Sequence, residues 1–272
     1  MAVLLWCLCV LVAARGGVRA VPRDIFVLAG QSNMAGRGGV FGGKWDGDVP
    51  PECRPSPWVL RFSAQLKWEE ACEPLHADID VTKTCGVGPG MAFANELVKT
   101  HGPGFVGLVP CAVGATKISQ WSRGSRLYNQ LVQRAALAMG EDGGTIRALL
   151  WYQGESDTVT KIDAESYKDK MERFIINLRS DLNLPSLLVI QVALASGEGK
   201  FIEKVRRAQM GITLPNVKCV DAKGLRLKPD QLHLTTMSQV HLGIRLARAY
   251  LASSTHHYQF NCNINYTQFI AI

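Results

Sequence analysis

Two short stretches of the chain carry residue types that together could hydrolyse an ester. Residues 30–34 (GQSNM) follow an apolar run near the amino terminus, and residues 230–233 (DQLH) lie close to the other end. A serine hydroxyl becomes a nucleophile when an imidazole takes its proton and an acid fixes the tautomer of that imidazole. The short spacing in DQLH lets the carboxylate reach one ring nitrogen while the other stays free. We therefore expect Ser32 as the nucleophile, His233 as the base and Asp230 as its partner.

The negative oxygen of the tetrahedral intermediate also needs hydrogen-bond donors. The amide of Ser32 is one candidate, because a sharp turn after a strand leaves backbone N–H groups free. Gly114, in the stretch CAVGATK at 111–117, offers a second amide, and Gln153, in WYQGESD at 151–157, offers a side-chain amide. All three follow predicted strands, so we expect them at one edge of a parallel sheet, where they would form the oxyanion hole.

Three other stretches match functional motifs less well. GESD at 154–157 resembles part of a lipase nucleophile elbow, but Thr158 stands where the second glycine belongs, so Ser156 is a second choice of nucleophile. GGVFGGK at 38–44 has the glycine and lysine spacing of a phosphate-binding loop, but a tryptophan follows where Ser or Thr must bind magnesium, and we reject it. His241 is the nearest competitor for the base, without a suitable acid nearby in sequence.

Strands alternating with amphipathic helices must position these residues. Apolar runs predict five buried strands, at 24–30, 104–112, 145–154, 187–194 and 217–222. Apolar positions at helical spacing predict helices at 91–100, 127–139, 164–181, 201–212 and 236–252. The predicted fold class is therefore α/β, a five-stranded parallel sheet with helices on both faces. Right-handed crossovers bring the carboxyl ends of the strands, and the residues after them, to one edge.

Composition limits the remaining possibilities. An apolar run from 3 to 14 followed by small residues predicts a cleaved secretory signal peptide over 1–20, with an uncleaved anchor as the alternative. No later stretch is apolar enough to cross a membrane, so we expect a secreted protein with one domain over 21–252 and a carboxyl-terminal tail over 253–272. The formal net charge is +7, but no basic run or recognition motif indicates a nucleic-acid partner.

Six cysteines remain after the signal peptide, an even number that is typical of disulfides in a secreted chain. The sequence does not choose a pairing among Cys53, Cys72, Cys85, Cys111, Cys219 and Cys262. None has the spacing of a zinc site, and no motif predicts a metal or another cofactor. The sequon NYT at 265–267 predicts a site for an N-linked glycan on Asn265.

Taken together and in this order, GQSNM, WYQGE and DQLH resemble the motifs of the sialate O-acetylesterase-type (SASA) domain of the SGNH hydrolase superfamily. Within it, they resemble the plant probable carbohydrate esterases, acetyl esterases of carbohydrate esterase family 6. The resemblance spans residues 24–251. It implies a three-layer α/β/α, flavodoxin-like fold and metal-free hydrolysis of acetyl esters on sugars. It assigns the triad roles to Ser32, His233 and Asp230 and the oxyanion hole to Gly114 and Gln153, the latter replacing the superfamily's usual asparagine.

Residues 35–90 interrupt the alternation of strands and helices. The segment is rich in Gly and Pro and contains Trp45, Trp58 and Trp68. A loop of this length is unusual in a compact domain and is often functional. We expect it to pack over the edge that carries Ser32 and to shape a cleft in which a tryptophan stacks on a sugar. The alternative is that the tryptophans form a satellite core pinned by disulfides.

The sequence thus predicts a secreted carbohydrate O-acetylesterase, and the resemblance implies acetylated xylan or another wall polysaccharide as substrate. One alternative is an esterase of the same fold that acts on lipids or small acyl esters. Another is a lectin-like protein that has kept the cleft but lost turnover, although the intact Ser32, Asp230 and His233 argue against it. The sugar, the acetyl position, the role of Glu155 and the oligomeric state stay open.

Overall fold

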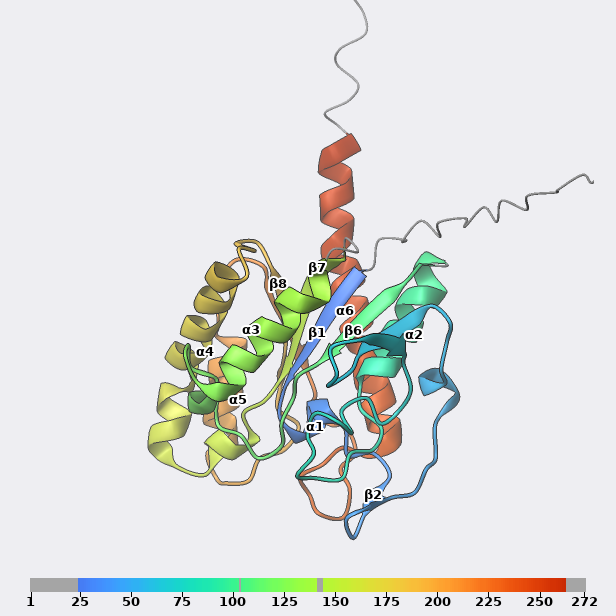
Figure 1. Cartoon of the computed structure of the whole chain (residues 1–272). Coiled ribbons are helices and arrows are strands. Elements are labelled where there is room, and N and C mark those ends of the chain that lie inside the picture. Colours follow the sequence, from blue (N-terminus) through green and yellow to red (C-terminus); the bar gives the residue numbers. More distant parts are fainter. Residues whose placement is uncertain (1–23, 103, 141–143, 263–272) are drawn as a thin grey trace, which may run out of the picture.

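A seven-stranded sheet forms the centre of the molecule (Figure 1). The computed structural model describes residues 24–102, 104–140 and 144–262, with side chains through Ser253. The predicted signal peptide and Asn265 lie outside the described residues. In spatial order the strands are β5 (Trp68–Glu70), β4 (Val59–Phe62), β6 (Val106–Pro110), β1 (Asp24–Gly30), β7 (Thr145–Tyr152), β8 (Leu188–Ala193) and β9 (Val217–Asp221).

All five predicted strands form, and they pair in parallel. β1 lies between β6 and β7, and β8 and β9 continue the sheet beyond β7. The side chains of β1 from Ile25 to Ala29 are almost completely buried, which explains why the strand reads as a continuous apolar run. The predicted parallel α/β sheet is confirmed.

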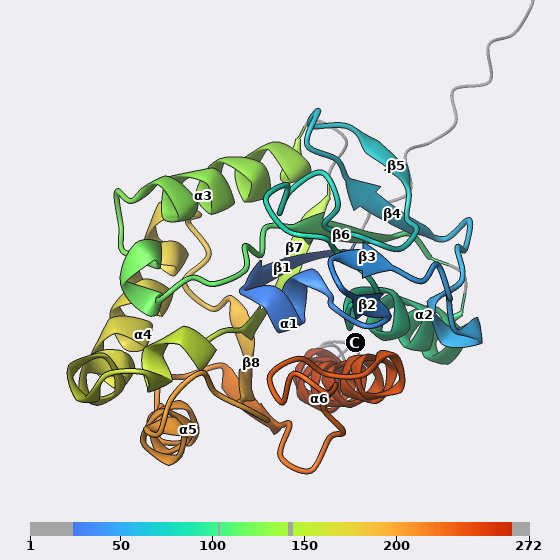
Figure 2. The same ribbon diagram turned by 90° about the horizontal axis from the view of Figure 1, so that it is seen from below.

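Helices cover both faces of the sheet and complete the three-layer α/β/α fold (Figure 2). One face packs against α3 (Arg126–Met139), α4 (Lys161–Asp181) and α5 (Ile202–Met210), and the other against α2 (Gly90–His101) and α6 (Thr236–Cys262). A one-turn helix, α1 (Ser32–Ala35), follows β1 directly. Three short 3₁₀ helices complete the helical segments: η1 (Pro51–Cys53), η2 (Ile118–Trp121) and η3 (Glu155–Thr158).

The longest amphipathic stripe in the sequence illustrates how local pattern becomes packing. In α4, Tyr167, Met171 and Phe174 recur at helical spacing and are at least 98% buried against the sheet. Thr160 caps the amino terminus of this helix, because its hydroxyl accepts a hydrogen bond from the Asp163 amide at 3.2 Å. The stripe therefore fixes which face of α4 meets the sheet, and the cap fixes where the helix begins.

The prediction of five strands was wrong in number, because the 35–90 segment adds two. β4 pairs in parallel with β6, and β5 pairs antiparallel with β4 as an edge strand. β4 was missed because it is short and contains Arg61, whose charge interrupts the apolar pattern. The Arg61 guanidinium is buried and forms ion pairs with Glu69 and Asp78. A charged residue therefore occupies a buried position of the strand, where an apolar residue is expected.

The same segment contributes a small hairpin near the site. β2 (Val40–Phe41) and β3 (Lys44–Trp45) form a two-stranded antiparallel sheet with Gly42 and Gly43 at its tip. This is the glycine- and lysine-containing stretch that we rejected as a phosphate-binding loop, and it is a β-hairpin rather than a strand–loop–helix.

Two further expectations, about the last helix and about the disulfides, need correction. The last helix does not end at Ala252, since α6 continues to Cys262 through part of the predicted tail; residues 263–272 lie outside the described residues. The expected disulfides are not formed by Cys53, Cys72, Cys85, Cys111 or Cys219, which are all free thiols, while the side chain of Cys262 is not described. Cys111 and Cys219, for example, lie after β6 and in β9, on opposite sides of β1. No helix in the described part of the chain is long and apolar enough to span a bilayer.

Candidate active site

The predicted triad residues meet at the carboxyl end of β1. The Nε2 atom of His233 lies 3.0 Å from Ser32 Oγ, and its Nδ1 atom lies 2.9 Å from Asp230 Oδ2. With the proton on Nδ1 donated to the carboxylate, Nε2 accepts the hydrogen bond of the serine hydroxyl. This is the arrangement that activates a serine nucleophile.

The turn after β1 fixes the position of Ser32. Gly30 has φ 127°, and a Cβ atom there would overlap the carbonyl oxygen of Tyr152. The Gln31 amide then donates to that same carbonyl at 2.8 Å, which ties the turn to β7. Ser32 is therefore the first residue of α1, and its amide has no acceptor among the described residues. A free amide at this position can serve an oxyanion, as predicted.

Asp230 is held by its own loop. Its Oδ1 atom accepts hydrogen bonds from the amides of Leu232 at 3.0 Å and His233 at 2.9 Å, while Oδ2 binds the imidazole. The Lys228 amide closes the loop by donating to the His233 carbonyl at 2.7 Å. Burial disfavours the charged carboxylate, but the hydrogen bonds from His233 and Leu232 outweigh it and lower the pKa of Asp230 to about 2. The carboxylate is therefore ionised and aimed at the imidazole.

The surroundings of His233 shift the pKa of its imidazole. Burial lowers the pKa of His233, and the positive charges of Arg37 and Lys228 act in the same direction, while Asp230 opposes them. The net effect is a pKa below the usual value, so the imidazole is neutral and able to accept a proton at neutral pH.

Asn33, which directly follows Ser32, connects it to the His233 loop. Its Oδ1 atom accepts from the Leu234 amide at 3.0 Å, and its Nδ2 atom donates to the Leu232 carbonyl at 3.3 Å. Nδ2 also donates to Glu155 Oε1 at 2.8 Å. The backbone on both sides of the base is thus tied to the residue that follows the nucleophile.

Glu155, whose role the sequence left open, is the support of Asn33. Its side chain is completely buried, and Oε2 has no partner among the described residues. Burial raises the pKa of Glu155 to about 7, against the hydrogen bond from Asn33, which lowers it. Neither Asn33 nor this contact was predicted, although both residues lie within the GQSNM and WYQGE motifs.

The other two predicted oxyanion donors lie at the expected edge but already have acceptors. The Gly114 amide donates to Asp80 Oδ2 at 3.1 Å. The Gln153 side chain is completely buried, and its Nε2 atom donates to the Thr116 carbonyl at 2.7 Å and to Asp157 Oδ2 at 2.6 Å. Because an amide nitrogen carries two hydrogens, Gln153 has none left for substrate in this arrangement. Its side chain instead joins the loop after β6 to η3.

A cavity of about 410 Å³ opens beside the triad. His233 and Asp230 line one side, and the β2–β3 hairpin, with Phe41 at its end, lines another. Arg37 and Lys228 give this cavity a positive character, and the Lys228 ammonium lies 5.1 Å from the centre of the Phe41 ring. A larger cavity, of about 600 Å³, lies near Asp24 at the opposite edge of the sheet and is remote from the nucleophile.

None of the three tryptophans of the 35–90 segment lines the cavity beside the triad. Trp45 is half-buried and packs against the core, Trp58 contacts Phe105, and Trp68 packs on Phe62 with ring centres 5.0 Å apart. They therefore act in packing, the alternative reading, although without disulfides among the described cysteines. Phe41, which is 56% exposed, is the aromatic residue that the segment offers to a ligand.

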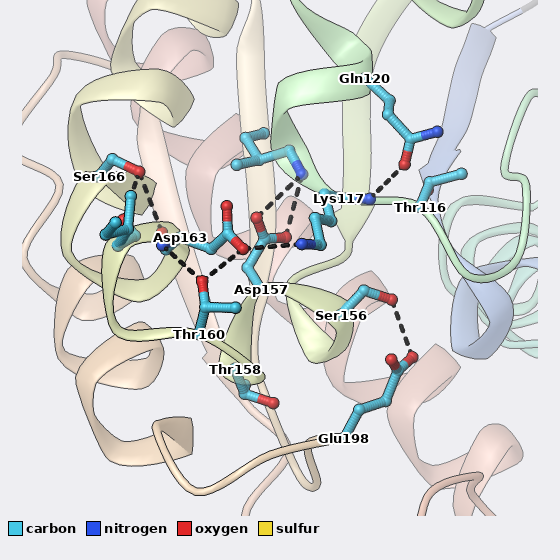
Figure 3. Close-up of polar contacts among 12 residues, drawn as sticks. Thr116, Lys117, Gln120, Ser156, Asp157, Thr158, Thr160, Asp163, Ser166 and Glu198 are labelled. Atoms are coloured by element: carbon cyan, nitrogen blue, oxygen red, sulfur yellow. Dashed lines mark hydrogen bonds and ion pairs between the residues drawn. The ribbon is translucent and has the colours of Figure 1, made fainter.

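The competing residues are placed where they cannot replace the triad. Ser156 donates to Glu198 Oε1 at 2.8 Å and has no histidine partner among the described residues (Figure 3). The same view shows Lys117 paired with Asp163. Their Nζ and Oδ2 atoms are 2.8 Å apart, and the pair joins the loop after β6 to the start of α4. His241 is exposed on α6.

No cluster of three or more His, Cys, Asp or Glu side chains that could hold a metal occurs in the part of the chain that the structure describes.

Comparison with known proteins gives matches over nearly the whole described chain. A family model (SASA) described as "Carbohydrate esterase, sialic acid-specific acetylesterase" matches residues 22–252. The chain is 58% identical over 241 residues to a probable carbohydrate esterase of Arabidopsis thaliana, which covers 85% of this chain and 92% of the relative. An X-ray structure of a protein from Arabidopsis thaliana, also 58% identical, matches with a TM-score of 0.82 over 85% of this chain and 98% of that chain. The crystal structure of NanS, 16% identical, matches with a TM-score of 0.70 over 87% of this chain and 98% of that chain, which shows a shared fold.

Proposed function

Because the chain belongs to the SASA family of carbohydrate esterases, we propose that it hydrolyses acetyl esters on a carbohydrate by a Ser–His–Asp mechanism. Ser32 is the nucleophile, His233 the general base and Asp230 the acid that orients the base. The observation that carries this proposal is the hydrogen-bonded chain Ser32 Oγ–His233 Nε2 and His233 Nδ1–Asp230 Oδ2, with distances of 3.0 and 2.9 Å.

In the first half of the reaction, Ser32 Oγ attacks the acetyl carbonyl carbon while its proton passes to His233 Nε2. The carbonyl π electrons move onto oxygen, and the Ser32 amide donates to the resulting oxyanion. When the intermediate collapses, the bond to the sugar oxygen breaks, and this oxygen leaves with the proton from His233. An acetyl group then remains on Ser32.

In the second half, water replaces the sugar hydroxyl. The water oxygen attacks the acetyl carbon while His233 takes a proton from the water. The second intermediate then expels Ser32 Oγ, which recovers the proton from His233. Acetate leaves, and the triad is restored. Asp230 stays ionised throughout, because its role is to stabilise the imidazolium that forms in each half.

A sugar ester in a secreted setting is the substrate class that we propose, with acetylated xylan or another wall polysaccharide as its first example. Two observations support a small acyl group on a polar alcohol rather than a lipid. The cavity beside His233 is lined by charged residues such as Arg37 and Lys228 and by the glycines of the β2–β3 hairpin, with no long apolar channel among its lining residues. The relative at 58% identity is named a probable carbohydrate esterase.

The test is acetate release by the mature chain and by Ser32→Ala from p-nitrophenyl acetate and from acetylated xylan. We expect turnover to fall about 10⁴-fold or more in the variant, since loss of a triad member removes the covalent route. Undiminished activity of Ser32→Ala would show that another residue is the nucleophile, and Ser156→Ala would be the next variant to measure. Absence of turnover on every ester, with no labelling by a fluorophosphonate probe, would favour the binding protein over the enzyme.

A further inference from the structure

The donors around the nucleophile do not suffice for the oxyanion as they stand. Mechanisms of this type place donors where the negative charge develops. The Ser32 amide is free, but the Gly114 amide is bonded to Asp80 and both hydrogens of Gln153 Nε2 have acceptors. One donor alone would meet the charge. A second hydrogen-bond donor must therefore come from a neighbouring group.

Arg37 lies at this point and is rigidly held. It is 95% buried, and its Nη1 atom donates to the Gly36 carbonyl at 2.8 Å and contacts Cys85 Sγ at 3.4 Å. Its Nη2 atom forms an ion pair with Asp80, whose side chain is completely buried. The same Asp80 oxygen accepts from the Gly114 amide at 3.1 Å. The guanidinium plane is thus fixed by contacts on both of its terminal nitrogens.

The guanidinium and the nucleophile flank the same glycine. A Cβ atom built on Gly114 would lie 2.7 Å from Arg37 Nη2 and 3.5 Å from Ser32 Cβ. The Asp80 carboxylate lies beside the same position, with Oδ2 3.1 Å from it, so the ion pair and the serine side chain both border Gly114. Arg37 also lines the cavity that contains His233.

The donor count of Arg37 leaves hydrogens for a ligand. A guanidinium carries five N–H groups, two of them on Nη2. One Nη2 hydrogen serves Asp80, and neither the second nor the Nε hydrogen has an acceptor among the described residues. A buried arginine that lines the cavity beside His233 and keeps free donors is suited to receive a developing negative charge.

We propose that Arg37 is a catalytic residue that donates a hydrogen bond to the oxyanion, together with the Ser32 amide. This assignment rests on the proposed acyl-transfer function. A charged donor gives a stronger bond to an anion than a neutral amide does, and the gain is larger in a site that excludes water. Asp80 is then a positioning residue: it holds the guanidinium and is itself held by the Gly114 amide, which explains why that amide is not free.

The competing explanation is that the Arg37–Asp80 pair only anchors the 35–90 segment. The chain offers a matched control for this, because Arg61 is also buried, also belongs to the segment and also pairs with an aspartate, Asp78, at 2.6 Å. Arg61 lies in β4 and does not line the cavity beside His233. Loss of either pair should destabilise the segment, but only loss of Arg37 should slow the chemical step.

The experiment compares Arg37→Met, Arg37→Lys and Arg61→Met with wild type on p-nitrophenyl acetate. Removal of an oxyanion donor costs about 10²- to 10³-fold in kcat, and we expect this loss with little change in KM for Arg37→Met. Arg37→Lys keeps the ion pair but not the rigid fork, so it should fold and still lose much of kcat. Arg61→Met should lower the melting temperature and keep kcat per folded molecule. In a further variant, Arg37→Ala, millimolar guanidinium should restore part of the lost rate.

Each outcome decides the assignment. A kcat for folded Arg37→Met or Arg37→Lys within a few-fold of wild type would overturn it, and so would equal losses in Arg37→Met and Arg61→Met. Failure of both Arg37→Met and Arg37→Lys to fold would make Arg37 a structural residue and would also overturn it. Full activity of Ser32→Ala would refute the proposed function itself. If kcat falls in Ser32→Ala but not in the Arg37 variants, only the inference about Arg37 is refuted.

Discussion

The Nδ2 atom of Asn33 lies 2.8 Å from Glu155 Oε1, and this contact joins the turn after β1 to the 3₁₀ helix after β7. Through its other contacts, Asn33 also binds the carbonyl before His233 and the amide after it. The nucleophile and the base, 201 residues apart, therefore share one support. Through its bonds to the backbone around His233, Asn33 can thus control the distance between the Ser32 and His233 side chains.

We first predict that this support sets the rate. Asn33→Ala should lower kcat on p-nitrophenyl acetate by about 10- to 100-fold, because small displacements of reacting groups are costly. Glu155→Ala should act in the same direction, and Glu155→Gln, which keeps an acceptor for Asn33, should retain more activity. Asn95→Ala is the control, since Asn95 also bonds two backbone carbonyls, of Glu52 and Arg54, on the exposed side of α2. Equal kcat in the Asn33 and Asn95 variants would contradict the role of Asn33.

The second prediction concerns the acid limb of the pH profile. The Lys228 ammonium lies 3.6 Å from Asp230 Oδ2 and helps to lower the pKa of His233. Because a nearby positive charge disfavours the imidazolium, removing it in Lys228→Gln should raise that pKa and move the acid limb of kcat/KM to higher pH. The wild-type limb should have its midpoint below 6.5, the ordinary value for histidine.

The pH profile is measured on p-nitrophenyl acetate at low ionic strength, where charge effects are least screened. Lys218→Gln, an exposed lysine of β9 near the opposite edge of the sheet, is the matched control and should leave the limb in place. A limb that stays in place or moves to lower pH in Lys228→Gln would contradict the prediction.

The third prediction concerns stability. Burial raises the pKa of Glu73 to about 8 from 4.5, although the amides of Leu75 and Gly88 donate to it. The folded state therefore holds this proton more tightly than the unfolded state, and stability must fall as pH rises from 4.5 towards 8. One pKa unit corresponds to about 1.4 kcal/mol, so Glu73 contributes a few kcal/mol to that fall.

Thermal unfolding between pH 5 and 8 tests this, and Glu73→Gln should show a weaker decrease of Tm with pH than wild type. Some decrease should remain, because Glu155, with a pKa of about 7, acts in the same direction. Glu52→Gln, an exposed glutamate in η1, serves as the control with the wild-type slope. A slope for Glu73→Gln equal to that of Glu52→Gln would show that Glu73 does not titrate in this range.

The fourth prediction concerns the substrate. Phe41 presents a half-exposed ring at the cavity beside His233, and the Lys228 ammonium lies 5.1 Å from its centre. If a sugar ring packs on it, Phe41→Ala should raise KM for acetylated xylan oligosaccharides by about 5-fold, the equivalent of about 1 kcal/mol of apolar contact. The increase should be smaller for p-nitrophenyl acetate, which lacks the sugar. Trp58→Ala removes a comparably exposed aromatic ring outside the cavity, and a matching rise of KM there would rule out a specific platform at Phe41.

Much of the fold could be predicted because its signals are local. The strand from Asp24 to Gly30 is a run of apolar residues whose length matches a buried strand, and the stripe on α4 has the period of a helix. β4 could not be predicted in the same way. The charge of Arg61 can be buried only because Glu69 and Asp78, from other parts of the segment, form ion pairs with it. These contacts leave no pattern in the sequence around Arg61.

For the site, the sequence by itself determined which three residues to expect together, and the side chains of Ser32, His233 and Asp230 do meet in the structure. Ser32 follows a buried strand and the Asp230–His233 pair precedes the last helix, and a parallel sheet brings such segments to one edge. Only the tertiary structure decided which donors remain free beside Ser32. The Gly114 amide and the Gln153 side chain are hydrogen-bond donors at the predicted edge of the sheet. They already donate to the carboxylates of Asp80 and Asp157. A hydrogen-bond donor serves the acceptor that packing brings within about 3 Å, and that acceptor lies far away in the sequence.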